Sequence, residues 1–362
     1  MVLPELRDGN TFVKKLIQTV EGYETERDFI PITGKSCGVA YRITMNRMKK
    51  IISAIVLALF ILAIPFKAGA QSGKELEGEI SLSGAFALYP LAVKWADEFK
   101  KLHPKVKIDI SAGGAGKGMT DALAKVVDLG MLSRDVHDDE FKKGAVAFAV
   151  AKDAVVATIN AKNPKLKELL AKGYTQETGG KLFITGQFTT WGQVLSANSN
   201  IPVHLYTRSD ACGAAETWAK FFGKRQEDLK GIAVFGDPGI ASAIQKDPLG
   251  FGYNNIAYAY DQKTKRPTAG LVVLPIDVNK NGKVDPEEQF YGTVTQFIRA
   301  IAAGKYPSPP ARTLYLVSNG KPKPLVAEFL KFILKDGQKY SNPAGFIQLT
   351  QGSLNANLAK LK

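Results

Sequence analysis

The residues best suited to bind an anion lie between Thr207 and Trp218, in the stretch T-R-S-D-A-C-G-A-A-E-T-W. An apolar run, residues 201–206, precedes this stretch, and A-A-E-T-W-A-K-F-F continues it with the apolar spacing of a helix. The first turn of a helix exposes unpaired backbone N–H groups, and the guanidinium of Arg208 adds a fixed charge that matches oxyanions. The pattern therefore predicts an oxyanion site; the alternative is an ordinary capped helix with a solvated arginine.

A second group of oxygen-bearing side chains lies in D-V-N-K-N-G-K-V-D-P-E-E, residues 277–288. The stretch matches a twelve-residue calcium loop at each ligand position and at its central glycine. Because the loop follows a predicted strand, residues 271–276, and not a helix, we expect one structural calcium ion; a polar turn is the alternative. The predicted ligands are Asp277, Asn279, Asn281, the carbonyl of Lys283, Asp285 and Glu288.

Three further strand ends in the first half of the chain carry small, hydroxyl or basic residues. The loops are S-G-A-F-A-L-Y-P (83–90) and S-A-G-G-A-G-K-G-M (111–119), and the third apolar run, 127–136, ends with Ser133 and Arg134. Glycine between a strand and a helix lets backbone N–H groups approach a ligand closely. Because ligands of open α/β sheets bind at the carboxyl ends of parallel strands, these loops predict a shared binding edge.

The overall composition is that of an ordinary globular protein with room for two domains. The chain has 362 residues, of which 45% are hydrophobic and 23% charged, and its formal net charge is +14. Two cysteines and three histidines without a cluster argue against a zinc site. The lysines are scattered and no recognition motif is present, which argues against nucleic-acid binding. The positive charge suits an anionic ligand; general surface charge is the alternative.

Residues 45–70 have the features of a secretory signal peptide: a basic start, an apolar core and an A-G-A cleavage site. Signal peptides are N-terminal, so we interpret residues 1–44 as an extension from a mis-assigned start, with translation beginning at Met45 or Met48. No cysteine follows the apolar core, which excludes a lipoprotein anchor; an uncleaved membrane anchor is the alternative. We therefore expect a periplasmic protein that begins near Gln71 and keeps one cysteine, Cys212.

The order of these motifs resembles the phosphate-binding proteins of ABC transporters. The similar segments include the loops at 83–90 and 111–119, the stretch 182–191 and the arginine loop at 207–217, and the resemblance extends from Glu79 to Leu361. It implies the type II periplasmic binding fold, an α/β architecture of two lobes joined by two crossover strands, with the anion in the cleft. Lobe 1 would comprise residues 77–152 plus 313–362, and lobe 2 residues 153–312.

The resemblance also implies which residues surround the ligand. Arg208 would supply the charge, Ser133 a hydroxyl, and the loops at 84–87 and 115–117 backbone amides. The full predicted set is Ser83, Gly84, Ala85, Phe86, Ala115, Gly116, Lys117, Ser133, Arg134, Arg208, Asp210, Cys212 and Gly213.

Several positions that carry hydroxyl donors in the family carry other residues here. Residues 85–87 offer only backbone N–H groups, Ala115 stands where the glycine loop usually has a serine, and Cys212 and Ala214 replace hydroxyl residues. Each missing charge-assisted hydrogen bond to a buried oxyanion costs roughly 1.5–3 kcal/mol. The sequence therefore predicts the class of ligand, phosphate or a similar tetrahedral oxyanion, and does not predict which oxyanion binds.

The predicted function is that of a monomeric periplasmic substrate-binding component of an ABC importer, with a permease in the inner membrane as its partner and no enzymatic activity. One alternative is a secreted phosphatase-like enzyme, because Cys212 lies near Arg208. The chain lacks the five-residue phosphate loop that ends in arginine, and no histidine is adjacent to serve as a base. An anion-sensing or adhesive protein without a role in transport is the other alternative.

Overall fold

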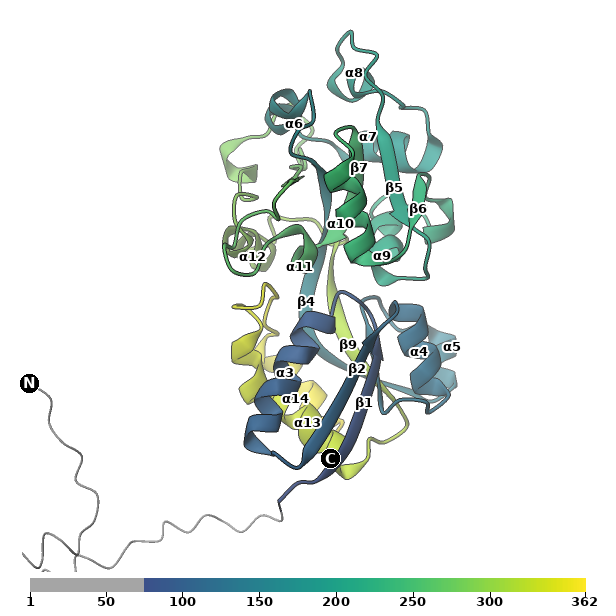
Figure 1. Cartoon of the computed structure of the whole chain (residues 1–362), viewed down its shortest axis with the longest axis vertical. Helices are drawn as coiled ribbons and strands as arrows, with labels where there is room; N and C mark the ends of the chain where they lie inside the picture. The colour runs from purple at the N-terminus through teal and green to yellow at the C-terminus, as the bar shows by residue number, and fades with distance from the viewer. Residues whose placement is uncertain (1–74) are drawn as a thin grey trace, which may run out of the picture. The chain divides into compact units, whose positions relative to one another are not determined.

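The structure, a computed structural model, describes residues 75–362 (Figure 1). The predicted signal peptide, residues 45–70, and the extension before it, residues 1–44, lie outside the described residues. Residues 74–362 form one compact unit. Between residues 75 and 362 no helix is both long and apolar enough to cross a membrane.

In the described part of the chain, nine strands form one sheet in the order β2-β1-β3-β9-β4-β7-β5-β6, with β8 paired to β4. Parallel pairing joins β1 to β2 and β3, and also β5 to β6 and β7, so each half of the sheet has an edge where carboxyl ends meet. The strands are β1 Gly78–Gly84, β2 Val106–Ala112, β3 Leu129–Leu132, β4 Ala145–Asn160, β5 His204–Arg208, β6 Ile232–Val234, β7 Gly250–Asn255, β8 Leu271–Val273 and β9 Ala311–Asn319.

One hydrophobic core packs on β1, β2 and β3, and we refer to its elements as lobe 1. Helix α3 starts with a proline in its first turn and buries Leu91, Trp95 and Phe99 along one face. The indole of Trp95 donates to the carbonyl of Gly337, 2.8 Å away, and so ties α3 to the C-terminal part of the chain. The helices of lobe 1 are α3 Tyr89–Leu102, α4 Ala115–Leu123, α5 Asp138–Lys142, α13 Pro324–Leu334 and α14 Gln351–Ala359, with a 3-10 turn at Asp336–Tyr340.

A second core packs on β5, β7 and β8, and its elements form lobe 2. Trp191, Trp218 and Phe221 are buried in it, and Trp218 stacks on Tyr253 with ring centroids 5.4 Å apart. Its helices are α6 Leu166–Lys172, α7 Gln176–Gly180, α8 Trp191–Leu195, α9 Gly213–Phe221, α10 Gly236–Lys246, α11 Ile256–Ala259 and α12 Val294–Ala302, with a π-helical turn at Lys181–Thr185 and 3-10 turns at Gln226–Asp228 and Pro286–Glu288.

Strands β4 and β9 run between the two lobes (Figure 1). Residues 145–154 of β4 pair with β9, and residues 155–159 pair with β7 in lobe 2. Asp153 stands opposite Arg312 where the pairing of β4 changes from one lobe to the other. The predicted α/β architecture, with two cores joined by two crossover strands, is therefore confirmed.

Candidate functional site

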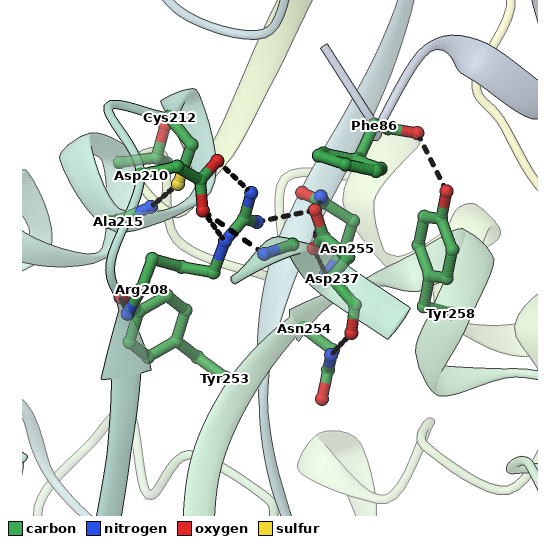
Figure 2. Close-up of polar contacts among 12 residues, drawn as sticks. Phe86, Arg208, Asp210, Cys212, Ala215, Asp237, Tyr253, Asn254, Asn255 and Tyr258 are labelled. Carbon is green, nitrogen blue, oxygen red and sulfur yellow. Dashed lines mark hydrogen bonds and ion pairs between the residues drawn. The ribbon is translucent and has the colours of Figure 1, made fainter. Parts of the chain in front are cut away.

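Arg208 is the last residue of β5 and is buried, with only 5% of its surface exposed. Its Nε and Nη2 donate to the two carboxylate oxygens of Asp210, at 2.8 and 2.5 Å. Its Nη1 donates to Oδ2 of Asp237 at 2.6 Å, so both carboxylates face the same guanidinium (Figure 2).

The two carboxylates change what Arg208 offers to a ligand. A guanidinium has five N–H donors, and three of them are used within the protein. The remaining two have no acceptor among residues 75–362. Burial by itself lowers the pKa of Arg208, but the charges of Asp237 and Asp210 outweigh burial and raise it, so the side chain stays protonated. One positive charge therefore lies between two negative ones.

Asp237 is itself held in place by a polar network that reaches the crossover strands. Its Oδ1 accepts from the side-chain amide of Asn255 at 2.6 Å, and its backbone carbonyl accepts from Asn254 at 3.1 Å. The Oδ1 of Asn255 in turn accepts from Arg312, whose Nε donates to Asp153 at 2.8 Å. Hydrogen bonds thus connect the arginine of the site with the point where the two lobes join.

The sequence analysis missed Asp237 and Asn255. Asp237 belongs to G-D-P-G, residues 236–239, which begins α10 directly after β6 in the same way that the arginine loop begins α9 after β5. Asn255 ends the buried strand β7, where a polar residue needs a partner. Both residues could have been predicted, because each is a polar residue at the carboxyl end of a lobe 2 strand.

The first turn of α9, which lies against lobe 1, has backbone amides without a hydrogen-bond acceptor in the described residues. Cys212 is the residue that caps α9, and its Sγ accepts from the amide of Ala215 at 3.4 Å. The amides of Gly213 and Ala214 have no acceptor within residues 75–362. Burial raises the pKa of the Cys212 thiol to about 12, so the thiol is protonated at neutral pH.

Ser133, from lobe 1, lies directly against this helix N-terminus. It is buried at the end of β3, and its hydroxyl has no hydrogen-bond partner among the residues that the structure describes. A Cβ at Gly213 would overlap both its carbonyl oxygen and its hydroxyl, so only glycine fits here. The predicted Ser133 and Gly213 are therefore neighbours that contact each other between the two lobes.

The first loop, residues 83–90, has fewer free hydrogen-bond donors than its sequence predicts. The hydroxyl of Ser83 donates to Asp121 at 2.6 Å, and the amide of Ala85 donates to the carbonyl of Met131 at 2.8 Å. A Cβ at Gly84 would overlap that same carbonyl. Of the predicted residues 84–87, Phe86 has the side chain that reaches lobe 2.

Some donors of the glycine loop, residues 111–119, also form hydrogen bonds within the protein. The amide of Gly116 donates across the cleft to the carbonyl of Ala211 at 3.3 Å. Lys117 pairs with Asp121, and half of its side chain is exposed. The amides of Ala115 and Lys117 have no acceptor within residues 75–362, so this end of α4 can still contribute to anion binding.

Arg134, which was predicted to bind the ligand, forms ion pairs with two glutamates. Its guanidinium donates to both oxygens of Glu140, at 2.8 and 2.5 Å, and its Nε lies 3.4 Å from Glu216 in α9. Burial raises the pKa of Glu140, but the bonds from Arg134 outweigh burial and lower it. A second ion pair across the lobes, Lys220 with Asp135 at 3.0 Å, lies nearby. Arg134 therefore links the two lobes and does not join Arg208.

The predicted calcium ligands lie in one loop after β8. Asp277 accepts from the amides of Asn281 and Gly282 at 3.1 and 2.9 Å, and Glu288 accepts from the amide of Val278 at 2.8 Å. Within residues 75–362 no three His, Cys, Asp or Glu side chains lie close enough together to share a metal ion. Calcium binding at Asp277, Asn279, Asn281, Lys283, Asp285 and Glu288 therefore stays a prediction.

Comparison with known proteins identifies the class to which this fold and cleft belong. A family model described as the PBP superfamily domain matches residues 69–336, about three quarters of the chain. The chain therefore belongs to the PBP superfamily.

The particular relatives narrow this class. A phosphate-binding protein PstS of Staphylococcus epidermidis is 24% identical over 303 residues, which cover 81% of this chain and 86% of the relative. Protein SphX of Synechococcus elongatus is 24% identical over 282 residues, covering 75% and 77%. The expected resemblance to phosphate-binding proteins of ABC transporters is confirmed.

Solved structures confirm the expected type II fold. A phosphate ABC transporter substrate-binding protein of Clostridium perfringens, with bound phosphate, superposes with a TM-score of 0.61 at 22% identity, covering 75% of this chain and 100% of that one. An ABC-type phosphate transport receptor of Vibrio cholerae gives a TM-score of 0.55 at 18% identity, with coverage of 75% and 100%.

Proposed function

We propose that the chain is the substrate-binding component of an ABC importer and binds phosphate or a similar tetrahedral oxyanion between its lobes. The observation that carries the proposal is the group formed by Arg208, the N-terminus of α9 and Ser133. An oxyanion requires hydrogen-bond donors, and within residues 75–362 this group has two guanidinium donors, two helix amides and one hydroxyl without an acceptor.

The charge of the site bears on how the anion is held. Because Asp210 and Asp237 already balance Arg208, the guanidinium contributes directed N–H donors more than excess positive charge. A helix N-terminus adds a partial positive charge that does not depend on any side chain. This favours a compact anion that accepts many hydrogen bonds at once, which is the chemistry of a tetrahedral oxyanion.

The names of the relatives support the transport role. We infer that the protein works outside the cytoplasm as a monomer and that its signal peptide is removed. We also infer that a membrane permease binds the closed, two-lobed form. We also infer that the protein has no enzymatic activity, because the thiol of Cys212 is protonated at neutral pH and already accepts a hydrogen bond.

Titration calorimetry with phosphate, arsenate, sulfate and molybdate tests this function. We expect at least one of the four to bind with one site per chain and with a dissociation constant in the micromolar range or below. The absence of a heat signal for all four anions, on protein that melts cooperatively, would contradict the proposal.

We propose separately that the loop at 277–288 binds one calcium ion as a structural clip. The support is the match of oxygen-bearing residues to the calcium-loop spacing. The loop lies wholly within lobe 2, so this ion would stabilise lobe 2 without taking part in anion binding.

A further inference from the structure

Phe86 projects from lobe 1 onto the arginine of lobe 2. It lies in the turn between β1 and α3, and the Cζ atom of Arg208 lies 5.5 Å from the centre of its ring. The ring also meets that of Phe235 edge to face, with centroids 5.8 Å apart. The carbonyl of Phe86 accepts from the hydroxyl of Tyr258 at 3.1 Å (Figure 2).

All of these partners belong to lobe 2, whereas Phe86 belongs to lobe 1. A Cβ at Gly236 would lie 3.2 Å from the tip of the Phe86 ring, and Gly236 also has a φ of 74°, so glycine leaves room for the ring at this point. The contacts of Phe86 therefore exist only while the lobes are together, and separation of the lobes would break all of them.

The position of the ring complements the hydrogen bonds of Arg208. The two carboxylates occupy edges of the guanidinium in its plane, and a flat face of the group is left for another partner. An aromatic ring over that face attracts the cation and removes water from it. Removing water strengthens the remaining N–H donors toward an anion, because electrostatic interactions grow as the local dielectric constant falls.

We propose that Phe86 is a positioning residue that closes the binding cleft: its side chain covers Arg208 and holds lobe 1 on lobe 2 while the anion is bound. This inference deepens the proposed function and rests on it for the identity of the ligand. It assigns to the side chain of Phe86 a role beyond that of the backbone amides of its loop.

Such a contact between the lobes should slow dissociation of the anion more than it changes the association rate. The anion enters while the lobes are apart, when Phe86 touches neither Arg208 nor Phe235. Leaving requires these contacts to break. Losing the cation–aromatic contact and the aromatic pair together should raise the dissociation rate about tenfold, which corresponds to about 1.4 kcal/mol.

The test measures oxyanion binding by stopped flow in the wild-type protein, in Phe86→Ala and in Phe86→Leu. We expect Phe86→Ala to raise the dissociation rate about tenfold and to change the association rate less than about threefold. Phe86→Leu should fall between the two, because it keeps apolar contact and loses the aromatic face. Phe141→Ala is the matched control, because Phe141 is a half-exposed phenylalanine of α5 in lobe 1, and it should bind as the wild type does.

A second readout follows lobe closure without a ligand. Spin labels at Lys101→Cys in lobe 1 and Lys246→Cys in lobe 2 of the chain from Gln71, whose one native cysteine is the buried Cys212, report the distance between the lobes by pulsed electron resonance. We expect the closed population of ligand-free protein to fall in Phe86→Ala. Unchanged dissociation rates together with an unchanged distance distribution would overturn the inference. If the wild type binds none of the four oxyanions, the proposed function fails, and the distance distributions alone decide the role of Phe86.

Discussion

Arg208 is the residue on which the site depends, and it also holds two buried carboxylates. Replacing it by alanine would leave Asp210 and Asp237 buried without their partner, which costs about 3–5 kcal/mol of stability. A loss of binding in that variant would therefore not separate ligand recognition from folding.

Arg208→Lys is the sharper variant. Lysine keeps the charge but has no planar fork, so it cannot serve Asp210, Asp237 and an anion together. We expect oxyanion affinity to fall at least about tenfold, since one charge-assisted hydrogen bond is worth about 1.5–3 kcal/mol. Calorimetry gives the affinity, and thermal unfolding serves as the control for stability. Wild-type affinity in Arg208→Lys would remove this guanidinium from the site.

Cys212 allows a test of the distinction between a binding protein and a thiol enzyme. Its pKa of about 12 lies above the value of about 8.5 for an unfolded cysteine. The stability gained by keeping the thiol protonated is complete below about pH 8.5 and is lost as the pH rises toward 12. We therefore expect stability to fall over this interval less in Cys212→Ala than in the wild type.

The same burial predicts that Cys212 is inert to alkylation at pH 8 in the folded protein. Peptide mass spectrometry after brief treatment with iodoacetamide measures this directly, and prior unfolding in guanidinium provides the positive control. Rapid alkylation of Cys212 in the native state would contradict the buried, protonated thiol and would favour the phosphatase-like alternative.

How much of the site could be predicted depends on where each signal lies in the chain. Arg208, Asp210 and Gly213 fall in one short loop, so their spacing was informative. The neighbouring positions of Ser133 and Gly213 required the resemblance, because the two residues come from different lobes. Asp237 and Asn255 were not predicted: their places at the carboxyl ends of strands could be seen in the sequence, but their link to Arg208 appears only when α10 and β7 are placed beside β5.

At the scale of elements, the crossover strands are held by a buried ion pair. Arg312 of β9 contacts Asp153 of β4 through two hydrogen bonds, at 2.8 and 3.1 Å, and both side chains are buried. Asp153→Asn removes the charge that balances Arg312. We expect a loss of about 3–5 kcal/mol in the free energy of unfolding, measured in urea.

A double variant provides the control for this pair. Asp153→Leu with Arg312→Met replaces both charges by apolar side chains, and we expect it to be more stable than Asp153→Asn, since no buried charge is left alone. Equal losses in the two variants would mean that packing, and not the ion pair, holds the strands at this point.

The loop after β8 is the second element that carries a prediction. If it binds calcium, then millimolar calcium raises the melting temperature and EDTA lowers it, because an ion that binds only the folded state stabilises it by about 2.7 kcal/mol at a hundredfold excess over Kd. Glu288→Gln should weaken this effect most, because the twelfth position normally supplies two oxygens. A melting temperature that responds to neither calcium nor EDTA would identify residues 277–288 as a polar turn.

At the scale of the whole molecule, the two-lobed α/β fold was the most predictable property. Apolar spacing located α9, and the order of the loops indicated the fold. The contacts between lobes were less predictable, because hydrophobic patterns describe what each core buries. The pair of Phe86 with Arg208 and the pair of Lys220 with Asp135 join surfaces that each lobe could expose by itself.

The central claim is that an oxyanion binds between the lobes at Arg208, and anomalous diffraction tests it most directly. Crystals grown with molybdate, measured at the molybdenum edge, would give the position of the bound anion. We expect one strong peak at the molybdenum of an anion whose oxygens accept hydrogen bonds from the Arg208 guanidinium, the hydroxyl of Ser133 and the amides of Gly213 and Ala214. A fully occupied peak elsewhere on the protein, or no peak at a concentration that saturates binding in solution, would contradict this account.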